Sequence, residues 1–191
     1  YVDTNGIMQR VGGWGNFGQM HSDVFAAIFK HADPDRPITV VELGIASGRG
    51  LATLAFLARG KNIKVYGVDH FQGTKGESRE YYFNDWDGIS AANVRLNLRN
   101  VEIEDHEYEI IELDTIEAAK QFKEVDYVFL DADHSYEGCV NDIQAWWPLV
   151  VPGGFIGGHD LPMPTVGKAV KEFFPKYNKV GDDCWNYQKP L

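Results

Sequence analysis

Short β-branched segments alternate with amphipathic segments along most of this chain, and the alternation limits the folds that it can adopt. The first unit is a β-branched run at residues 38–43, a glycine-punctuated turn, and a stretch rich in leucine and alanine at residues 51–59. The run predicts a buried strand, and the apolar stretch that stops at Gly60 predicts a helix. Strands that alternate with helices predict a parallel or mostly parallel sheet with helices on both faces. We therefore expect an α/β fold.

The same alternation continues toward the C-terminus. Apolar residues at helical spacing, such as Val140, Ile143 and Trp147, mark the helices. The segment around Tyr187 predicts a last strand, antiparallel to its neighbours. Further strands are expected at residues 64–68, 109–113, 125–130 and 155–156, and helices at residues 91–98, 116–122, 137–147 and 166–174.

The length and composition fit one globular domain. With 191 residues, of which 44% are hydrophobic, the chain can bury a sizeable core. We expect a single domain over residues 1–191 that opens with a helical segment at residues 1–37. Residues 71–90, with Tyr81 and Trp86, are too long and too aromatic for a plain connection. They predict an active-site lid or an inserted loop.

Charge, hydropathy and cysteine content exclude several classes of protein. Lys and Arg number 18 against 28 Asp and Glu, a formal net charge of −10. This argues against a nucleic-acid partner, because cationic side chains supply most of the affinity for phosphates. Apolar stretches such as residues 54–58 are far shorter than the roughly 20 residues that cross a bilayer, so we expect no membrane partner. Two cysteines without zinc-site spacing predict a reducing, cytoplasmic location, and the oligomeric state stays open, a homo-oligomer included.

Five predicted strands end in, or just before, a carboxylate. These residues are Glu42, Asp69, Asp114, Asp131 and Asp160. The carboxyl ends of parallel strands meet at one edge of the sheet, where open α/β folds bind their ligands. Like charges gathered at such an edge are costly without a ligand. The pattern therefore predicts a functional cleft.

The turn after the first strand, from Gly44 to Gly50, lets the backbone approach a ligand closely. The G-x-G-x-x-G fingerprint of dinucleotide-binding folds fails in both possible registers, and the Gly-Lys-Ser/Thr of a P-loop is absent. Glu42 lies two positions before the first glycine, where it could take the ammonium of an amino-acid-bearing cofactor. The alternative is a tight strand-to-helix turn that binds nothing.

Two further acids each have a binding and a structural interpretation. Asp69 lies where a carboxylate can accept both hydroxyls of a ribose, or else it caps a helix or is a solvated loop acid. Asp114, followed by Thr115, is placed to reach an adenine amino group. It is equally placed to cap the helix that starts at Ile116.

The chain resembles the class I S-adenosylmethionine-dependent methyltransferases over residues 39–189. Glu42-x-Gly44-x-Ala46-x-Gly48 is similar to their first motif, with Ala46 in place of a common glycine, and Asp69 stands at their ribose-binding acid. The resemblance implies a Rossmann-like sheet and S-adenosylmethionine as cofactor. The cofactor-binding residues that it implies are Glu42, Gly44, Ala46, Ser47, Gly48, Asp69, His70, Asp114, Thr115 and Asp131.

A narrower resemblance lies in residues 125–138 and 152–160. These segments are similar to the metal-dependent small-molecule O-methyltransferases, particularly those acting on sugar hydroxyls of natural products. The resemblance implies a divalent metal, with Mg²⁺ as the expected ion, at Asp131, His159 and Asp160. Where relatives carry a second acid, this chain has His159. As a ligand, His159 shifts the metal preference of the site toward Mn²⁺, Fe²⁺ or Zn²⁺. The alternative is that His159 does not touch the ion and instead contacts one of its ligands.

The residue chemistry agrees with this implication. Asp131 and Asp160 can supply hard oxygen ligands, and a vicinal diol of the acceptor can fill other positions on the ion. The ion would lower the pKa of a bound hydroxyl, and Asp133 or His134 would take its proton. The resemblance points to Asp133 as the base. The alternative is that these acids bind no metal.

We therefore expect a methyltransferase that modifies an oxygen of a small hydroxylated acceptor. Two rival functions stay open. One is a nicotinamide-dependent oxidoreductase on the same fold, against which the failed fingerprint counts. The other is a non-catalytic module that binds the cofactor or a partner.

Overall fold

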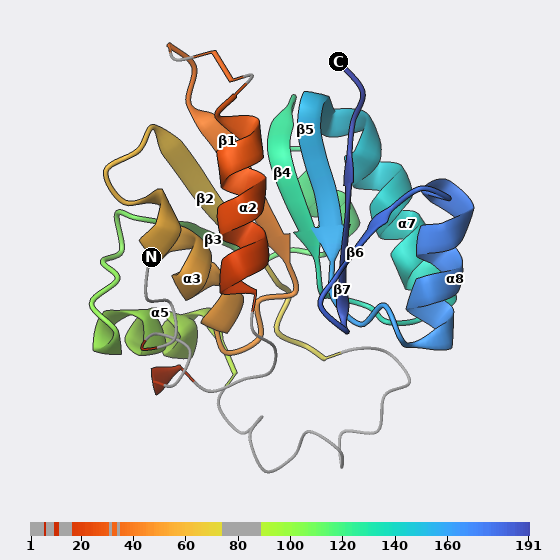
Figure 1. Cartoon of the computed structure of the whole chain (residues 1–191). Helices are drawn as coiled ribbons and strands as arrows, with labels where there is room; N and C mark the ends of the chain where they lie inside the picture. Colours follow the sequence, from red (N-terminus) through yellow and green to blue (C-terminus); the bar gives the residue numbers. More distant parts are fainter. Residues whose placement is uncertain (1–5, 7–9, 12–16, 31, 34, 74–88) are drawn as a thin grey trace.

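The computed structural model describes residues 6, 10–11, 17–30, 32–33, 35–73 and 89–191. In this part of the chain, seven strands form one sheet in the order β3-β2-β1-β4-β5-β7-β6 (Figure 1). The first five strands in the chain are parallel, whereas β7 runs antiparallel to both β5 and β6. The strands are β1 Ile38–Leu43, β2 Ile63–Val68, β3 Glu109–Ile111, β4 Val125–Leu130, β5 Val150–Gly158, β6 Asn178–Val180 and β7 Cys184–Gln188.

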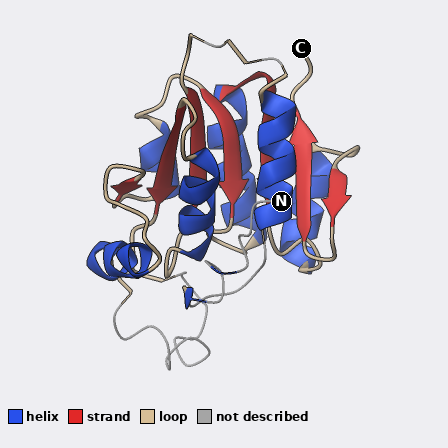
Figure 2. Cartoon of the chain, turned by 60° about the vertical axis from the view of Figure 1, so that its left-hand side comes forward, coloured by secondary structure: helices blue, strands red, loops and turns tan. Residues whose placement is uncertain are grey.

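Helices cover both faces of the sheet (Figures 1 and 2). Helices α2, α3 and α5 pack on one face over one hydrophobic cluster, and α6, α7 and α8 pack on the other over a second cluster. No helix among the described residues is long and apolar enough to cross a membrane. The helices are α2 Gly18–Ile28, α3 Arg49–Ala58, α5 Ala91–Asn100, α6 Thr115–Ala119, α7 Tyr136–Trp146 and α8 Pro164–Phe173, with a 3₁₀ turn at Trp147–Leu149.

The two faces follow from the alternation of side chains along each strand. In β4, Tyr127 and Phe129 belong to the cluster under α2 and α3, and Val128 belongs to the cluster under α7 and α8. All three are fully buried. A strand buried on both faces needs an almost continuous apolar run, which is why the sequence of β4 reads as it does.

The strand order creates a switch point between β1 and β4. The chain moves outward from β1 to β2 and β3, then returns to place β4 on the other side of β1. Crossovers therefore leave in opposite directions from these two neighbours, and open α/β folds form their ligand-binding crevice beyond the carboxyl ends of such strands. The loops that follow Leu43 and Leu130 meet there.

A partly buried ion pair holds the opposite end of the same two strands. Both guanidinium nitrogens of Arg36, just before β1, donate to the carboxylate of Asp126 in β4, at 3.0 and 2.5 Å. The backbone N–H of Thr39 donates to the same carboxylate at 2.8 Å. Asp126 is only 1% exposed, and its hydrogen bonds raise the pKa of Arg36. This contact fastens β1 to β4 far from the crevice.

The expected α/β fold is confirmed, including the antiparallel C-terminal strand, with two differences in the strands. The chain ends in a hairpin of β6 and β7 rather than in one strand. Strand β5 begins at Val150, five residues before the expected strand at residues 155–156. The register against β4 shifts between Val125 and Tyr127, so a bulge accommodates the extra residues.

Parts of the expected helical segment at residues 1–37 and of the expected lid at residues 71–90 lie outside the described residues. Helix α2 lies within residues 1–37. Most of the expected lid, residues 74–88 with Tyr81 and Trp86, lies outside the described residues.

Candidate active site

The loop after β1 is built around one glycine that lies against the next strand. Gly44 has a φ of +78°, and a Cβ placed on it would lie 2.1 Å from the backbone oxygen of Asp131. The N–H of Asp131 in turn donates to the oxygen of Leu43 at 2.8 Å. Only glycine permits this approach. The β1 loop and the β4 loop are therefore in direct contact at the switch point.

Ala46 keeps the backbone conformation that glycine would adopt at this place in the motif. Its φ is +44°, and that of Gly48, which precedes α3, is +89°. The left-handed region costs a residue with a side chain about 1–2 kcal/mol. Asn97 of α5 stabilises the loop by donating from its side-chain amide to the oxygen of Ser47 at 3.1 Å.

Asp69 organises this loop. Its Oδ2 accepts hydrogen bonds from the N–H groups of Ile45 and Ala46, at 3.1 and 3.0 Å, and its Oδ1 accepts from the N–H of Phe71 at 2.7 Å. An ionised carboxylate has about four acceptor sites, so capacity for one hydroxyl remains. A ribose-binding role stays a prediction, and the role in shaping the loop was not anticipated from the sequence. The neighbouring His70 is exposed and accepts from the N–H of Gln72 at 3.0 Å.

Glu42 is buried beneath the same loop. It is 2% exposed, and a Cβ on Gly50 would lie 1.9 Å from its Oε1, so the carboxylate lies against the first turn of α3. Its Oε2 has no hydrogen-bond partner among the described residues. Burial raises the pKa of Glu42 well above its usual value, and the charges of Asp131 and Asp69 raise it further. A buried carboxylate in this state gains from a cationic group nearby, which fits the ammonium of an amino-acid cofactor.

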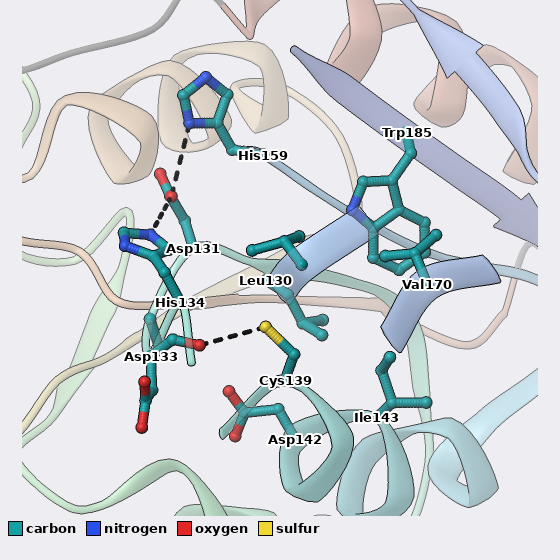
Figure 3. A pocket seen from close by; sticks show the side chains of 12 residues that line it. Leu130, Asp131, Asp133, His134, Cys139, Asp142, Ile143, His159, Val170 and Trp185 are labelled. Carbon is teal, nitrogen blue, oxygen red and sulfur yellow. Dashed lines mark hydrogen bonds and ion pairs between the residues drawn. The ribbon is translucent and has the colours of Figure 1, made fainter. Parts of the chain in front are cut away.

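Two imidazoles and two carboxylates converge at the ends of β4 and β5. Ligand atoms of Asp131, His134 and Asp160 all lie within 4.8 Å of one another. The Nε2 atom of His134 is 3.6 Å from Asp131 Oδ1 and 3.0 Å from Asp160 Oδ2. His159 Nδ1 is at the same two distances from the same two oxygens. Figure 3 shows the carboxylate of Asp131 between the two rings.

The carboxylates control the protonation of both rings. Hydrogen bonds to Asp131 and Asp160 raise the pKa of His134 to about 11, against the effect of burial. Burial lowers the pKa of His159, but hydrogen bonds to the same two acids outweigh it and raise the value to about 10. Burial raises the pKa of Asp160, and the hydrogen bonds from the two rings overcome this and lower it. The four side chains therefore form one cluster, in which each ring contacts both carboxylates.

Asp133 does not join this cluster. Its Oδ1 accepts from the N–H of Ser135 at 2.8 Å, and Figure 3 shows its carboxylate directed away from that of Asp131. Ser135 Oγ then caps α7 by accepting from the N–H of Gly138 at 3.0 Å. The side chain of Cys139 donates to the backbone oxygen of Asp133 at 3.2 Å. The role of Asp133 as a base stays a prediction, and of the two candidate bases the cluster contains His134.

Asp114 caps a helix in this structure. Its Oδ1 accepts from the N–H of Ile116 at 2.9 Å, which is the structural interpretation of this acid. Thr115 donates its hydroxyl to Asp142 Oδ1 at 2.5 Å, and Trp146 Nε1 donates to the oxygen of Thr115 at 3.1 Å. Binding of adenine by Asp114 and Thr115 stays a prediction.

Asp142 was missed in the sequence, although a signal was present. It lies in the middle of the apolar stripe of α7, next to Ile143, and is 4% exposed. Burial raises the pKa of Asp142 to about 7, with the Thr115 hydrogen bond acting in the opposite direction. An acid within a buried helical stripe predicts a specific polar partner.

Helix α2 supports the cluster from the other face of the sheet, and no pattern in the sequence indicated this. The ring of Phe17 packs edge-on against His159 with centroids 5.0 Å apart. His21 is fully buried beside Phe129, and its Nδ1 lies 3.1 Å from the hydroxyl of Tyr127. Burial lowers the pKa of His21 to about 3, so the ring is neutral.

A small cavity lies between the cluster and helices α7 and α8 (Figure 3). Its volume is about 20 Å³, room for one water molecule and not for an organic acceptor. Trp185, whose Nε1 has no hydrogen-bond partner among the described residues, lines it together with Asp142.

Comparisons with solved structures agree with this architecture. The O-methyltransferase NovP superposes with a TM-score of 0.74 at 18% identity, covering 91% of this chain and 79% of NovP. CalS11, a TDP-rhamnose 3'-O-methyltransferase of calicheamicin biosynthesis, gives 0.62 at 13% identity over 90% and 78% of the two chains. MycE of the mycinamycin pathway, solved with Mg, SAH and mycinamycin VI, gives 0.63 at 12% identity over 99% and 55%. At these identities the similarity shows a shared fold.

A family model places the chain more closely. Comparison with curated protein sequences gives no match. Residues 41–161, more than half of the chain, match the model described as a methyltransferase domain. This range holds the β1 loop, Asp69 and the acids that end β4 and β5, so the resemblance seen in the motifs is confirmed. The chain belongs to the family of S-adenosylmethionine-dependent methyltransferases that this domain defines.

Proposed function

We propose that this methyltransferase transfers the methyl group of S-adenosylmethionine to a hydroxyl of a small-molecule acceptor, with a divalent cation at the ends of β4 and β5. The observation that carries the proposal is the convergence of Asp131, His134 and Asp160 at the switch point, with Asp131 also in contact with Gly44 of the cofactor loop. A reacting hydroxyl held by this cluster would lie beside the cofactor. Diols, sugars and related natural products are the acceptor class.

The cofactor is assigned to the β1 loop and the acids around it. Glu42 would receive the ammonium, Asp69 the ribose, and Asp114 with Thr115 the adenine, while Gly44, Ala46, Ser47 and Gly48 form the loop between them. Support comes from the unpaired Oε2 of Glu42 and from the two left-handed residues that shape the loop. His70 lies at the exposed rim of this region.

The cluster has the chemistry of a cation site. Two carboxylates and two imidazoles offer oxygen and nitrogen donors. The residues that would hold the ion are Asp131, His159 and Asp160, together with His134. A bound divalent cation lowers the pKa of a coordinated hydroxyl. Asp133, or His134 where it is not itself a ligand of the ion, would accept the hydroxyl proton, while the oxygen bonds to the methyl carbon and the carbon–sulfur bond breaks to leave S-adenosylhomocysteine.

The test is methyl transfer from labelled S-adenosylmethionine to a panel of diols and sugars, with and without a chelator, beside calorimetric titration with S-adenosylhomocysteine and with NADH. We expect S-adenosylhomocysteine to bind without added metal, NADH not to bind, and labelled product to need a divalent ion. Binding of NADH alone would favour the oxidoreductase. Cofactor binding without turnover on any acceptor would favour a non-catalytic module.

A further inference from the structure

We infer that the cation site of this chain selects a first-row transition-metal ion of the Fe²⁺ to Zn²⁺ series over Mg²⁺, because two of its donors are imidazoles. The inference rests on the proposed function, since it concerns the same cluster. It departs from the expectation of Mg²⁺ and assigns roles as ligands to both His134 and His159.

Three of the donors have the spacing of ligands around one ion, because ligand atoms of Asp131, His134 and Asp160 lie within 4.8 Å of one another, and His159 contacts the same two carboxylates. Both imidazole nitrogens lie 3.0 Å from Asp160 Oδ2 and 3.6 Å from Asp131 Oδ1. Two ligands at right angles on an ion with bond lengths of about 2.1 Å lie about 3.0 Å apart. The distance from each imidazole nitrogen to Asp160 is therefore the one expected for two ligands of the same ion.

The donor types decide which ion the cluster prefers. Mg²⁺ takes oxygen ligands almost exclusively and keeps several waters, so each imidazole replaces an oxygen that this ion favours. Imidazole is a good ligand for iron, cobalt, nickel and zinc, and affinity for mixed nitrogen and oxygen sites rises along the first row. A set of two carboxylates and two imidazoles, from Asp131, Asp160, His134 and His159, therefore favours these ions.

The surroundings hold both rings at the cluster. The side chains of His134 and His159 are 20% and 13% exposed, so neither extends into solvent. Phe17 packs edge-on against the His159 ring, and Asp160 adopts a left-handed backbone with φ of +54°. A strained residue at such a place is kept because the surrounding structure requires its direction. Both rings are thus held beside the acids, His159 by the Phe17 contact and each ring by its contacts to the two carboxylates.

The experiment titrates the full chain, treated with a chelator and dialysed, with Co²⁺, Zn²⁺ and Mg²⁺ by competition calorimetry. The visible absorption of bound Co²⁺ reports nitrogen ligation independently of activity. We expect Co²⁺ and Zn²⁺ to bind tighter than Mg²⁺ by about tenfold or more. His159→Asp, which exchanges a nitrogen for an oxygen donor, should narrow or reverse this ratio and shift the Co²⁺ bands. His134→Gln should weaken Co²⁺ by about tenfold and leave Mg²⁺ less affected.

Exposed His106 provides the matched control, because His106→Gln should leave all affinities unchanged. Affinity for S-adenosylhomocysteine, measured on each variant, shows that the variants are folded. Equal or tighter binding of Mg²⁺, or Co²⁺ bands unchanged in both cluster variants, would overturn the inference, while Mg²⁺-dependent methyl transfer would leave the proposed function intact. If no divalent ion binds, the inference and the cation part of the proposed function both fail.

Discussion

The hydroxyl of Thr115 donates a 2.5 Å hydrogen bond to the buried carboxylate of Asp142. This contact joins α7 to the first turn of α6. Helix α7 follows His134 of the cluster, and α6 follows Asp114, the acid that is predicted to bind adenine. Trp146 adds a second hydrogen bond to the backbone oxygen of Thr115 at 3.1 Å. Because α7 makes both contacts, it links the cofactor side of the site to the cluster side.

Asp142 should make stability depend on pH. Its pKa is about 7 in the folded protein and about 4 in an unfolded chain, so between these values the folded state holds a proton that the unfolded state has released. The free energy of unfolding therefore falls as pH rises through this window, and the loss is complete above pH 7. We expect Asp142→Asn to flatten this dependence and to be more stable than the unmodified chain at pH 8 by about 1 kcal/mol or more. Urea unfolding at pH 5 and pH 8 measures both, with the exposed Asp182→Asn as control.

Thr115→Val should remove the donor from Asp142 while keeping the shape of the side chain. We expect a loss of about 1–3 kcal/mol in the free energy of unfolding, because a buried acceptor is left without its partner. Thr115→Ser keeps the hydroxyl and should recover most of the loss. Unfolding in urea gives the stability, and calorimetry gives the affinity for S-adenosylhomocysteine, which should fall in the valine variant alone if α6 positions the adenine.

Asp131→Asn should abolish methyl transfer and leave the affinity for S-adenosylhomocysteine within about threefold. The amide keeps the backbone contact to the β1 loop, yet it removes the charge that both rings of the cluster face. Single-turnover methyl transfer and calorimetry on the same sample separate the two effects. A variant with full turnover would exclude Asp131 from the cation site.

Asp69→Ala should weaken cofactor binding by about tenfold or more, since both the loop and the ribose lose an acceptor. The N–H groups of Ile45 and Ala46 would have to find water instead. Calorimetry with S-adenosylhomocysteine measures the loss, and His70→Gln at the rim is the control. Unchanged affinity in Asp69→Ala would remove this acid from the cofactor site.

Arg36→Ala should destabilise the fold without affecting the chemistry. Asp126 would remain buried and, within the described part of the chain, would keep only the N–H of Thr39 as a donor. We expect a loss of about 2 kcal/mol, less than for a fully buried pair because the Arg36 side chain is 30% exposed. Thermal unfolding should show the loss, and cofactor affinity should be unchanged since the pair lies at the far end of β1 and β4. A weaker cofactor affinity would mean that this pair also controls the crevice.

Local patterns in the chain are sufficient to predict the order of the elements and the edge of the sheet that carries the site. Strand runs such as residues 38–43 and 125–130 are apolar because both faces of a parallel strand are buried. The acids that end these strands must then lie at one edge, because parallel strands share a direction. Gly44 can be identified from the sequence for a similarly local reason, because the turn after the first strand needs a backbone conformation that favours glycine.

Contacts between distant segments determined which of those acids lie together, and no local period in the sequence encodes these contacts. Asp131 and Asp160 meet His134 through the pairing of β4 with β5, whereas Asp133, two residues from Asp131, turns away to accept from Ser135. Phe17, the residue before α2, contacts His159 across more than a hundred residues of the chain. Asp142 finds Thr115 across two helices. Such pairings depend on side-chain directions set by packing in three dimensions, which residue spacing along the chain does not specify.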